Sequence, residues 1–372
     1  CAERRAHRER VRPLAQAEGG VLAEPLRADR PFPPFDASAM DGFAVAGPGP
    51  WRLVDATRAA GHVESAALAT GQAARIATGA MLPEGADRVI RHEETDLQHD
   101  VLTETGSVRD DTRRIGNAWR AGELLAETGL SVDQSVLSTA RAAGVPSASV
   151  RGPLCAAVHT TGDEVVPLAE GDLRPGQIPD TASAPVAAIL REHGLHAAVG
   201  RHLSDSPETF AELFAAPGDA DLFVVIGATG HGVADHLRAA LHRVDAAVLV
   251  DGVALRPGGS LMVAQLPGGV VVLGLGGNPL AAVAGAATFT SSILDGLACR
   301  TPAVADVLAV VDDDLVRHRD QWRVLPVEPD GDGRWLVSPG AGTGHLRAMI
   351  GHRGLALFPP AGRTPDRVER VR

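Results

Sequence analysis

The chain of 372 residues contains no lysine and no tyrosine, and aromatic residues make up only 3% of it. Without lysine, every positively charged side chain is an arginine or a histidine, which excludes any catalytic role for a lysine. The formal net charge is −11. Such a charge argues against a nucleic-acid-binding protein, because binding phosphates requires clustered basic side chains. We therefore expect no nucleic-acid partner.

Cysteine is also scarce, since Cys1, Cys155 and Cys299 are far apart and form no CxxC pair. This spacing disfavours a disulfide framework and a zinc site, and no HExxH motif occurs. No apolar run of about 18 residues suggests a transmembrane helix. The charged N-terminus is unlike a signal peptide, so we expect a cytoplasmic protein without a membrane partner. The first residue is not Met, which is compatible with a start inside a longer gene product.

Hydrophobic residues make up 45% of the chain, and its length predicts two to four domains. The spacing in residues 2–26 predicts a short helix and a turn. Residues 31–45 read as a structured loop anchored by the burial of Phe32, Phe35 and Phe43. Short strands with frequent turns over residues 51–129 predict a small all-β unit. A helix is expected at residues 131–143, with Ser131 as its N-cap and Gly144 after its end.

From Leu154 onward, continuous apolar strands alternate with helices. The helices are expected at residues 181–193, 207–215, 233–242 and 280–297. This alternation predicts a parallel sheet covered on both faces, whose ligands bind at the carboxyl ends of the strands. After Thr301 short strands recur, which favours a small β-barrel or sandwich.

Three polar or glycine-rich turns follow strands of that sheet. The anion turn, Gly227 to Asp235 (GATGHGVAD), can bring backbone N–H groups and a helix N-terminus to a phosphate, although a tight structural turn explains it equally well. In LGLGGNP, Asn278 is expected to cap the next helix, starting near Pro279. Asp163 and Glu164 can bind Mg²⁺ or act as acid and base, or simply form a solvated turn.

Several longer motifs occur in a fixed order along the chain. They are PPFDASAMDGFAV, ATGAMLPEGADRVIRHEET, GNAWRAGELLAETG, TTGDEVVPLAEGDLRPGQIPDT, LGGNPLA and GTGHLRAMIGHRGLALFPP. Together they resemble the signature segments of the molybdopterin molybdenumtransferases, and the resemblance covers nearly the whole chain.

The resemblance implies a multidomain α/β fold with four parts. These are a split N-terminal domain (1–46 and 130–152), an inserted β domain (47–129), a doubly wound molybdopterin-binding α/β domain (153–300) and a C-terminal β-barrel-like domain (301–372). It also implies a homodimer, whose site lies between the α/β domain of one subunit and the split or inserted domain of the other.

The implied reaction inserts molybdate into adenylated molybdopterin and releases AMP, with Mg²⁺ or another divalent cation. Other cofactor-biosynthesis proteins and apo-molybdoenzymes are possible further partners. Matching motif positions imply catalytic roles for Asp41, Glu164 and Asp235, and metal binding by Asp163 and Asp180. Binding of the substrates is implied for Asp36, Ser38, Met40, Thr78, Gly79, Gly227, Thr229, Gly230, Arg256, Gly277, Asn278 and Pro279.

Some positions depart from the family pattern. The KPGKP segment is Arg256-Pro257-Gly258-Gly259-Ser260 here, so both lysines are absent. Gly276 and Ala281 replace a proline and a serine of the PGNPVS turn, and Phe43 replaces a tyrosine. Three hypotheses follow: an active molybdenumtransferase that uses Arg256, a non-catalytic molybdopterin-binding carrier, sensor or scaffold, and an adenylyltransferase-like enzyme suggested by the GATG segment.

Overall fold

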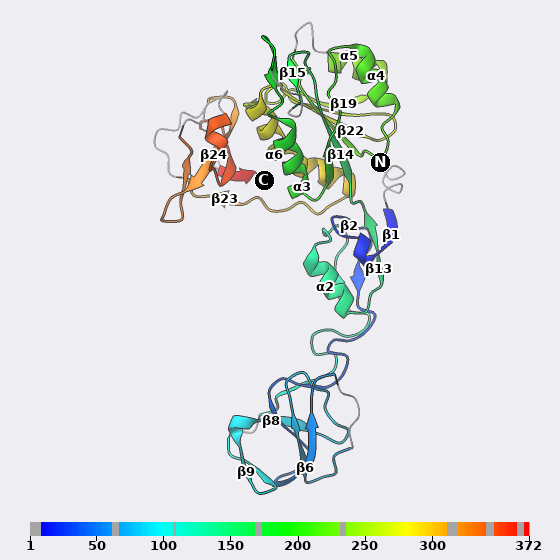
Figure 1. Ribbon diagram of the computed structural model, residues 1–372, viewed down its shortest axis with the longest axis vertical. Helices are drawn as coiled ribbons and strands as arrows, with labels where there is room; N and C mark the ends of the chain where they lie inside the picture. Colours follow the sequence, from blue (N-terminus) through cyan, green and yellow to red (C-terminus); the bar gives the residue numbers. More distant parts are fainter. Residues whose placement is uncertain are drawn as a thin grey trace.

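A computed structural model of the chain describes residues 9–61, 67–106, 109–167, 173–230, 236–310, 318–339, 346–362 and 368–371. The α/β domain and a C-terminal sheet lie side by side at one end of an elongated molecule (Figure 1). A small domain that contains both N-terminal and mid-chain segments follows, and the inserted β domain forms the other end. The chain is thus a multidomain α/β protein, as expected.

The split domain is built around a three-stranded antiparallel sheet in the order β1-β13-β2. Its elements are β1 (Glu9–Pro13), the 3-10 helix η1 (Leu14–Gln16), β2 (Val21–Leu22), α2 (Gln134–Ala142) and β13 (Ser147–Arg151). The helix predicted for residues 2–26 is therefore wrong from Glu9 onward, and residues 2–8 lie outside the described part. Pairing of Glu9–Pro13 along β13 overrides the local helical spacing, and a proline ends the segment.

Helix α2 confirms the helix predicted for residues 131–143, but its N-cap is Asp133 rather than Ser131. The Asp133 carboxylate accepts a hydrogen bond from the Val136 N–H at 2.9 Å. This contact satisfies one of the N–H groups that a first helical turn leaves unpaired. The cap therefore lies two residues after the predicted one.

The inserted domain is a six-stranded sheet in the order β8-β5-β7-β6-β10-β9, with β6 and β7 parallel. The strands are β5 (Gly42–Val45), β6 (Trp51–Arg58), β7 (Gln72–Ile76), β8 (Arg88–Arg91), β9 (Thr95–Gln98) and β10 (Val101–Glu104), with the 3-10 helix η2 (His92–Glu94). Two ribbons join it to the split domain: β4 (Ala37–Ser38) with β11 (Thr112–Arg113), and β3 (Leu26–Arg27) with β12 (Leu124–Ala126). Because β5 belongs to this sheet, we propose moving the first domain boundary from residue 46 to before β4.

Of the three phenylalanines expected to anchor residues 31–45, only Phe43 is fully buried. Phe32 and Phe35 are each 39% exposed. Phe32 stacks on Trp119, with ring centroids 4.9 Å apart, at the ribbon that leads to the inserted domain. A narrow ribbon has too few neighbours to enclose these rings, so the prediction of burial is wrong for both.

The α/β domain contains a six-stranded sheet in the order β17-β14-β18-β22-β21-β19. Its strands are β17 (His196–Val199), β14 (Cys155–Thr160), β18 (Leu222–Ile226), β22 (Val271–Leu275), β21 (Met262–Gln265) and β19 (Ala247–Asp251). The first four are parallel, as predicted, but β21 and β19 are antiparallel additions. A short parallel pair, β15 (Val165–Val166) and β16 (Ile178–Pro179), flanks the carboxyl end of β14.

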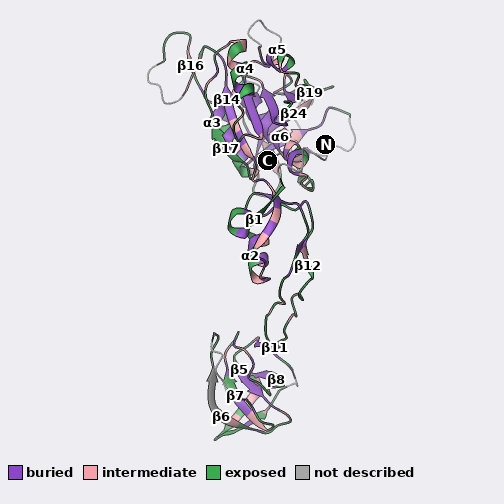
Figure 2. Ribbon diagram, turned by 90° about the vertical axis from the view of Figure 1, so that its right-hand side faces the viewer, coloured by how far each residue is buried: buried purple, intermediate pink, exposed green. Residues whose placement is uncertain are grey.

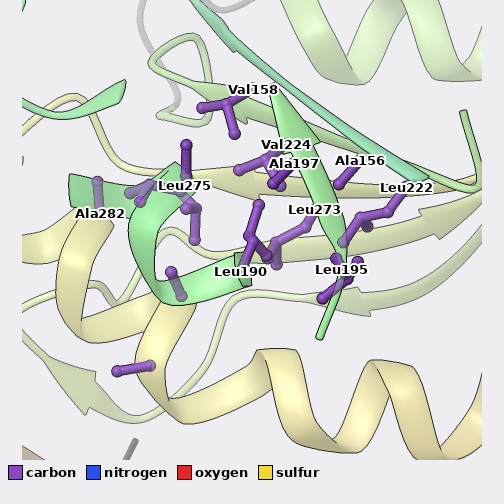
Figure 3. Close-up of a cluster of buried hydrophobic side chains, with 14 of the residues drawn as sticks. Ala156, Val158, Leu190, Leu195, Ala197, Leu222, Val224, Leu273, Leu275 and Ala282 are labelled. Atoms are coloured by element: carbon purple, nitrogen blue, oxygen red, sulfur yellow. The ribbon is translucent and has the colours of Figure 1, made fainter. Parts of the chain in front are cut away.

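Helices cover both faces of this sheet, as the sequence predicted. One core contains side chains of α3 (Ser183–Glu192) and α6 (Pro279–Ala298), and the other contains those of α4 (Pro207–Ala215) and α5 (His236–Arg243). Figure 3 shows the first core, where Leu190 of α3 lies with Leu195 and Leu273. All three are at most 3% exposed, and burying each leucine contributes about 1.5–3 kcal/mol.

Helix α6 is 20 residues long, and its most apolar window has a mean hydropathy of 1.4. By length and composition alone, it could cross a membrane. In the structure, however, 61% of this window is buried inside the protein. Figure 2 shows buried residues concentrated around β14 and α6, as expected for the core helix of an α/β layer.

The C-terminal sheet packs beside α6 and runs in the order β20-β24-β26-β27-β23, with β25 paired to β24. Its strands are β20 (Leu255–Arg256), β23 (Val307–Leu308), β24 (Trp322–Pro329), β25 (Trp335–Val337), β26 (Gly354–Phe358) and β27 (Val368–Val371), with the 3-10 helix η3 (Leu346–Met349). The strand β20 is contributed by the α/β domain, so the two domains share a continuous sheet edge.

Candidate functional site

A pocket of about 420 Å³ lies at the carboxyl ends of β14, β18 and β22. The three turns that the sequence analysis singled out all contribute to its wall. Thr161 and Glu164 come from the turn after β14, Gly227 and Thr229 from the anion turn, and Gly277 from the turn after β22. The parallel sheet places β14, β18 and β22 next to one another, and this brings the three turns together.

Gly227 is the closest point of contact between two of the turns. Its φ is +101°, and a Cβ atom placed on it would lie 2.3 Å from the Thr161 hydroxyl oxygen. A Cβ on Gly277 would lie 3.7 Å from the Cα of Gly227, so the third turn is adjacent as well. Glycine is required at Gly227 both by backbone conformation and by lack of space.

Thr229 is 2% exposed and is fixed on two sides. Its hydroxyl lies 3.0 Å from that of Ser260, which also lines the pocket. Its methyl group packs against the backbone of Gly274, where an added Cβ would approach it to 2.9 Å. The described part of the anion turn, residues 227–230, therefore presents backbone and hydroxyl groups to the pocket.

The N-terminus of α6 meets the same pocket. Asn278 is the N-cap, as predicted, and its side-chain oxygen accepts a hydrogen bond from the Ala281 N–H at 3.1 Å. Pro279 is the first helical residue and lines the pocket together with Gly276 and Gly277. A helix N-terminus carries partial positive charge, so this side of the pocket favours an anion.

Acidic side chains also line the pocket. The described residues that line it include Glu164, Asp180 and Asp205, and no arginine is among them. Asp180 is buried and accepts hydrogen bonds from the N–H groups of Ala182 and Ser183 at 3.0 Å, and from the Ser183 hydroxyl. The local role of Asp180 is thus to bind the N–H groups of the two residues at the start of α3.

Asp163, the second predicted metal ligand, is exposed and turns its carboxylate toward the Asp205 N–H, at 3.3 Å. Within the described ranges, no group of three or more acidic, histidine or cysteine side chains is arranged to hold a metal ion. Glu164 and Asp180 still fit Mg²⁺, because Mg²⁺ is commonly bound by one or two carboxylates together with substrate phosphates.

Arg256 does not line this pocket. It is exposed at the end of β20, where it pairs in register with Arg323 of β24. Asp235, a predicted catalytic residue, lies outside the described residues. In a single chain, Arg256, the cation expected to bind substrate, is therefore not among the residues that line the pocket.

The signature-loop residues form a second cluster, in and around the inserted domain. Asp36 accepts a hydrogen bond from the Ile115 N–H at 2.7 Å and pairs with Arg114 at 3.0 Å. Ser38 is fully buried, and its hydroxyl donates to the Met40 carbonyl. Both Asp36 and Ser38 thus organise the loop itself, whereas Met40 is 37% exposed.

Asp41 is the most accessible acid of this cluster. Its carboxylate accepts hydrogen bonds from the Thr78 N–H at 2.6 Å and the Thr78 hydroxyl at 2.9 Å. These bonds lower the pKa of Asp41 below its usual value, so the carboxylate stays ionised in neutral solution. Gly79 follows with φ +79°, and its N–H donates to the Ser38 carbonyl at 2.8 Å.

The structure thus divides the predicted site residues into two clusters. One surrounds the pocket of the α/β domain, and the other lies in the inserted domain at the far end of the molecule (Figure 1). Sequence reasoning missed Ser260 and Asp205 as pocket residues. Ser260 ends the Arg256–Ser260 segment, whose departure from the family pattern is the loss of its lysines, and Asp205 belongs to no motif.

Comparison with known proteins places both clusters in one family. A family model described as "MoeA N-terminal region (domain I and II)" matches residues 2–144. A model described as "Probable molybdopterin binding domain" matches residues 157–296. The first match contains the signature loop and the second contains the pocket.

Curated relatives and solved structures agree with these matches. The chain is 33% identical to a molybdopterin molybdenumtransferase of Synechococcus elongatus, over 94% of this chain and 90% of that protein. It is 32% identical to one of Nostoc, over 72% of this chain and 64% of that protein. The structure of a molybdopterin biosynthesis MoeA protein from Pyrococcus horikosii is similar with a TM-score of 0.69 and 25% identity, covering 98% and 94% of the two chains.

Proposed function

Because this chain belongs to the molybdopterin molybdenumtransferase family, a family of transferases in molybdenum cofactor biosynthesis, we propose that it inserts molybdate into adenylated molybdopterin and releases AMP. The observation that carries this proposal is the pocket at the carboxyl ends of β14, β18 and β22. Its lining combines backbone and hydroxyl donors with carboxylates, which suits a pyrophosphate bound together with a divalent cation.

The donors of the pocket bind the phosphates of the adenylate in this proposal. The anion turn around Gly227 and Thr229 supports one phosphate, and the N-terminus of α6 at Gly277, Asn278 and Pro279 faces molybdate or a second phosphate. These groups need no lysine, because N–H and hydroxyl donors fixed by the fold stabilise negative charge without a formal cation.

Glu164 and Asp180 would hold Mg²⁺, with Asp163 as an additional ligand if its turn moves toward the pocket. Bound Mg²⁺ would neutralise charge on the pyrophosphate oxygens. We assign Glu164 to orienting the water that attacks the pyrophosphate linkage, since it is exposed at the pocket while Asp180 is engaged with α3. Asp235 would share the catalytic role.

The signature loop completes the site from a second copy of the chain. Asp41, Thr78 and Gly79 form an exposed, ionised edge of the inserted domain, too far along the molecule to reach the pocket of the same chain (Figure 1). A homodimer that places this edge, together with Asp36, Ser38 and Met40, over the partner's pocket would unite both clusters. Arg256 would supply the cation at the molybdate side.

A non-catalytic molybdopterin-binding role is the second candidate, and one observation favours it. Arg256 stands outside the pocket, and no described lining residue carries a positive charge. In this case the chain would bind molybdopterin or its adenylate as a carrier, sensor or scaffold. In either role we place the protein in the cytoplasm, where it would deliver to other cofactor-biosynthesis proteins or to apo-molybdoenzymes.

Molybdate-dependent AMP release tests the proposal. The purified protein is incubated with adenylated molybdopterin and Mg²⁺, with and without molybdate, and AMP is measured by chromatography. We expect molybdate to trigger AMP release, and Glu164→Gln to lower the rate by roughly 10²-fold or more. Glu192→Gln, an exposed glutamate at the end of α3, is the matched control and should leave the rate unchanged. Adenylate binding without AMP release would favour the second candidate.

A further inference from the structure

Arg238 of α5 forms hydrogen bonds with the anion turn but does not itself line the pocket. One guanidinium nitrogen, Nη1, donates hydrogen bonds to two consecutive carbonyls, of Thr229 at 2.7 Å and of Gly230 at 2.6 Å. Both residues line the pocket. We propose that Arg238 is a positioning residue that makes the anion turn competent to bind a pyrophosphate group.

Arg238 and its hydrogen bonds to the Thr229 and Gly230 carbonyls, here called the clamp, are also bound to the sheet. The Nε of Arg238 donates to the Asp251 carboxylate at 3.0 Å, and Asp251 is the last residue of the edge strand β19. The arginine is only about one-fifth exposed, with 21% of its side chain accessible. A planar guanidinium can contact a carboxylate and two carbonyls at once, which an ammonium group on a flexible stem cannot do.

The clamp determines where the Thr229 and Gly230 carbonyls of the anion turn point. Carbonyl oxygens carry partial negative charge, and a carbonyl that faces the pocket would repel a phosphate. Arg238 binds the carbonyls of Thr229 and Gly230 away from the pocket, while the Ser260 hydroxyl fixes the Thr229 side chain. The described end of the anion turn, at Thr229 and Gly230, is therefore held in one orientation before the ligand arrives.

The charge of Arg238 is balanced by its ion pair with Asp251, so its two hydrogen bonds to the turn, and not a net positive charge, support an anionic ligand. These bonds act at a pocket whose described lining includes Glu164, Asp180 and Asp205 and no arginine. The inference rests on the proposed function for its substrate, but it applies to any pyrophosphate-containing ligand of this pocket.

Calorimetric binding of inorganic pyrophosphate with Mg²⁺ tests the proposal in the full-length chain, together with the kinetics of AMP release. We expect Arg238→Ala to raise the Kd for pyrophosphate and the KM for adenylate by roughly tenfold, with kcat within about twofold, because charged hydrogen bonds to the turn are lost. Arg238→Lys keeps the charge and one bond, so it should recover about a third of this loss.

Arg300→Ala is the matched control. Arg300 forms a similar ion pair, with 2.7 Å between its Nε and the Asp295 carboxylate, and it does not line the pocket. It should leave the pyrophosphate Kd unchanged. If Arg238→Ala does not fold, Asp251→Asn releases the clamp while keeping the arginine, and we expect a rise in Kd of roughly threefold.

Wild-type protein that does not bind pyrophosphate, a folded Arg238→Ala or Asp251→Asn variant with unchanged Kd, or an equal effect of Arg300→Ala would each overturn the inference. If the wild type releases no AMP while its pyrophosphate binding still depends on Arg238, the inference stands and the proposed reaction fails. The two claims are therefore separable by the same samples.

Discussion

At the scale of single residues, close packing of the backbone at glycines shapes the pocket more than reactive side chains do. Gly227 joins the anion turn to the turn after β14, and Gly274 makes room for the methyl group of Thr229. Ala228, between Gly227 and Thr229 in the turn, adopts a left-handed conformation with φ +55° although it is not glycine. Such a conformation costs about 1–2 kcal/mol, which the contacts around the turn offset.

Gly227→Ala should therefore damage the pocket. The added Cβ would lie 2.3 Å from the Thr161 hydroxyl oxygen on a backbone with φ +101°, so we expect a loss of about 1–3 kcal/mol in the free energy of unfolding. Urea titration measures it. Gly268→Ala is the control, because nothing lies within 4 Å of an added Cβ there. Equal unfolding midpoints for the two variants would contradict the packing described here.

Asn278 and Arg238 show which contacts of the site can be predicted from the sequence and which cannot. Asn278 was identifiable as a helix cap because the cap, the following proline and the apolar helix are contiguous. Arg238, by contrast, meets Thr229 and Asp251 only after the sheet has formed, and no local pattern distinguishes it from other arginines. Contacts between residues that are distant in sequence are the part of the site that local reasoning could not supply.

At the scale of elements, the strand-to-helix units of the α/β domain were predictable and the additions to them were not. Helix α4 has the predicted bounds, Pro207–Ala215. The strands β21 and β19 run antiparallel at one edge, and β1 forms a strand where helical spacing predicted a helix. In each missed case, pairing with a distant strand outweighs the local pattern, because strand preference depends on context.

Strand β14 carries a histidine in an apolar setting. His159 is buried against Phe223, its Nδ1 lies 3.0 Å from the Arg201 carbonyl, and its Nε2 has no hydrogen-bond partner among the described residues. Burial lowers the pKa of His159 below its ordinary value of 6.5. The unfolded chain therefore gains a proton at a higher pH than the folded one, so the protein should lose stability as the pH falls below about 6.5.

Urea unfolding at pH 7.5 and at pH 5.5 measures this effect. We expect the loss of stability between these pH values to shrink in His159→Gln, which cannot be protonated. The control is His196→Gln, at an exposed histidine of the neighbouring strand β17, and it should keep the wild-type difference. An unchanged pH dependence in His159→Gln would show that other groups cause the acid sensitivity.

At the scale of the whole molecule, the elongated arrangement is the most informative feature. The chain keeps two groups of predicted site residues far apart, one in the α/β domain and one in the inserted domain (Figure 1). The family resemblance already implied a site shared between subunits, because the signature loop and the pocket turns belong to different domains. Composition and periodicity alone could not have shown which domains meet.

This arrangement makes a quantitative prediction about mixed dimers. Asp41→Asn inactivates the signature-loop half and Glu164→Gln the pocket half, so each variant alone should release almost no AMP. In a heterodimer of the two, one site combines an intact loop with an intact pocket. Random assembly makes roughly half of the dimers mixed, each with one working site out of two, so activity should return to roughly a quarter of the wild type.

The most direct test is therefore molybdate-dependent AMP release by the two variants, each alone and after co-expression. A mixture of Glu164→Gln and Asp180→Asn, which damage the same half, is the control and should stay inactive. Recovery of activity only in the Asp41→Asn and Glu164→Gln mixture is the result we predict. If that mixture stays as inactive as its components while wild-type protein releases AMP, the two clusters do not form a site between subunits.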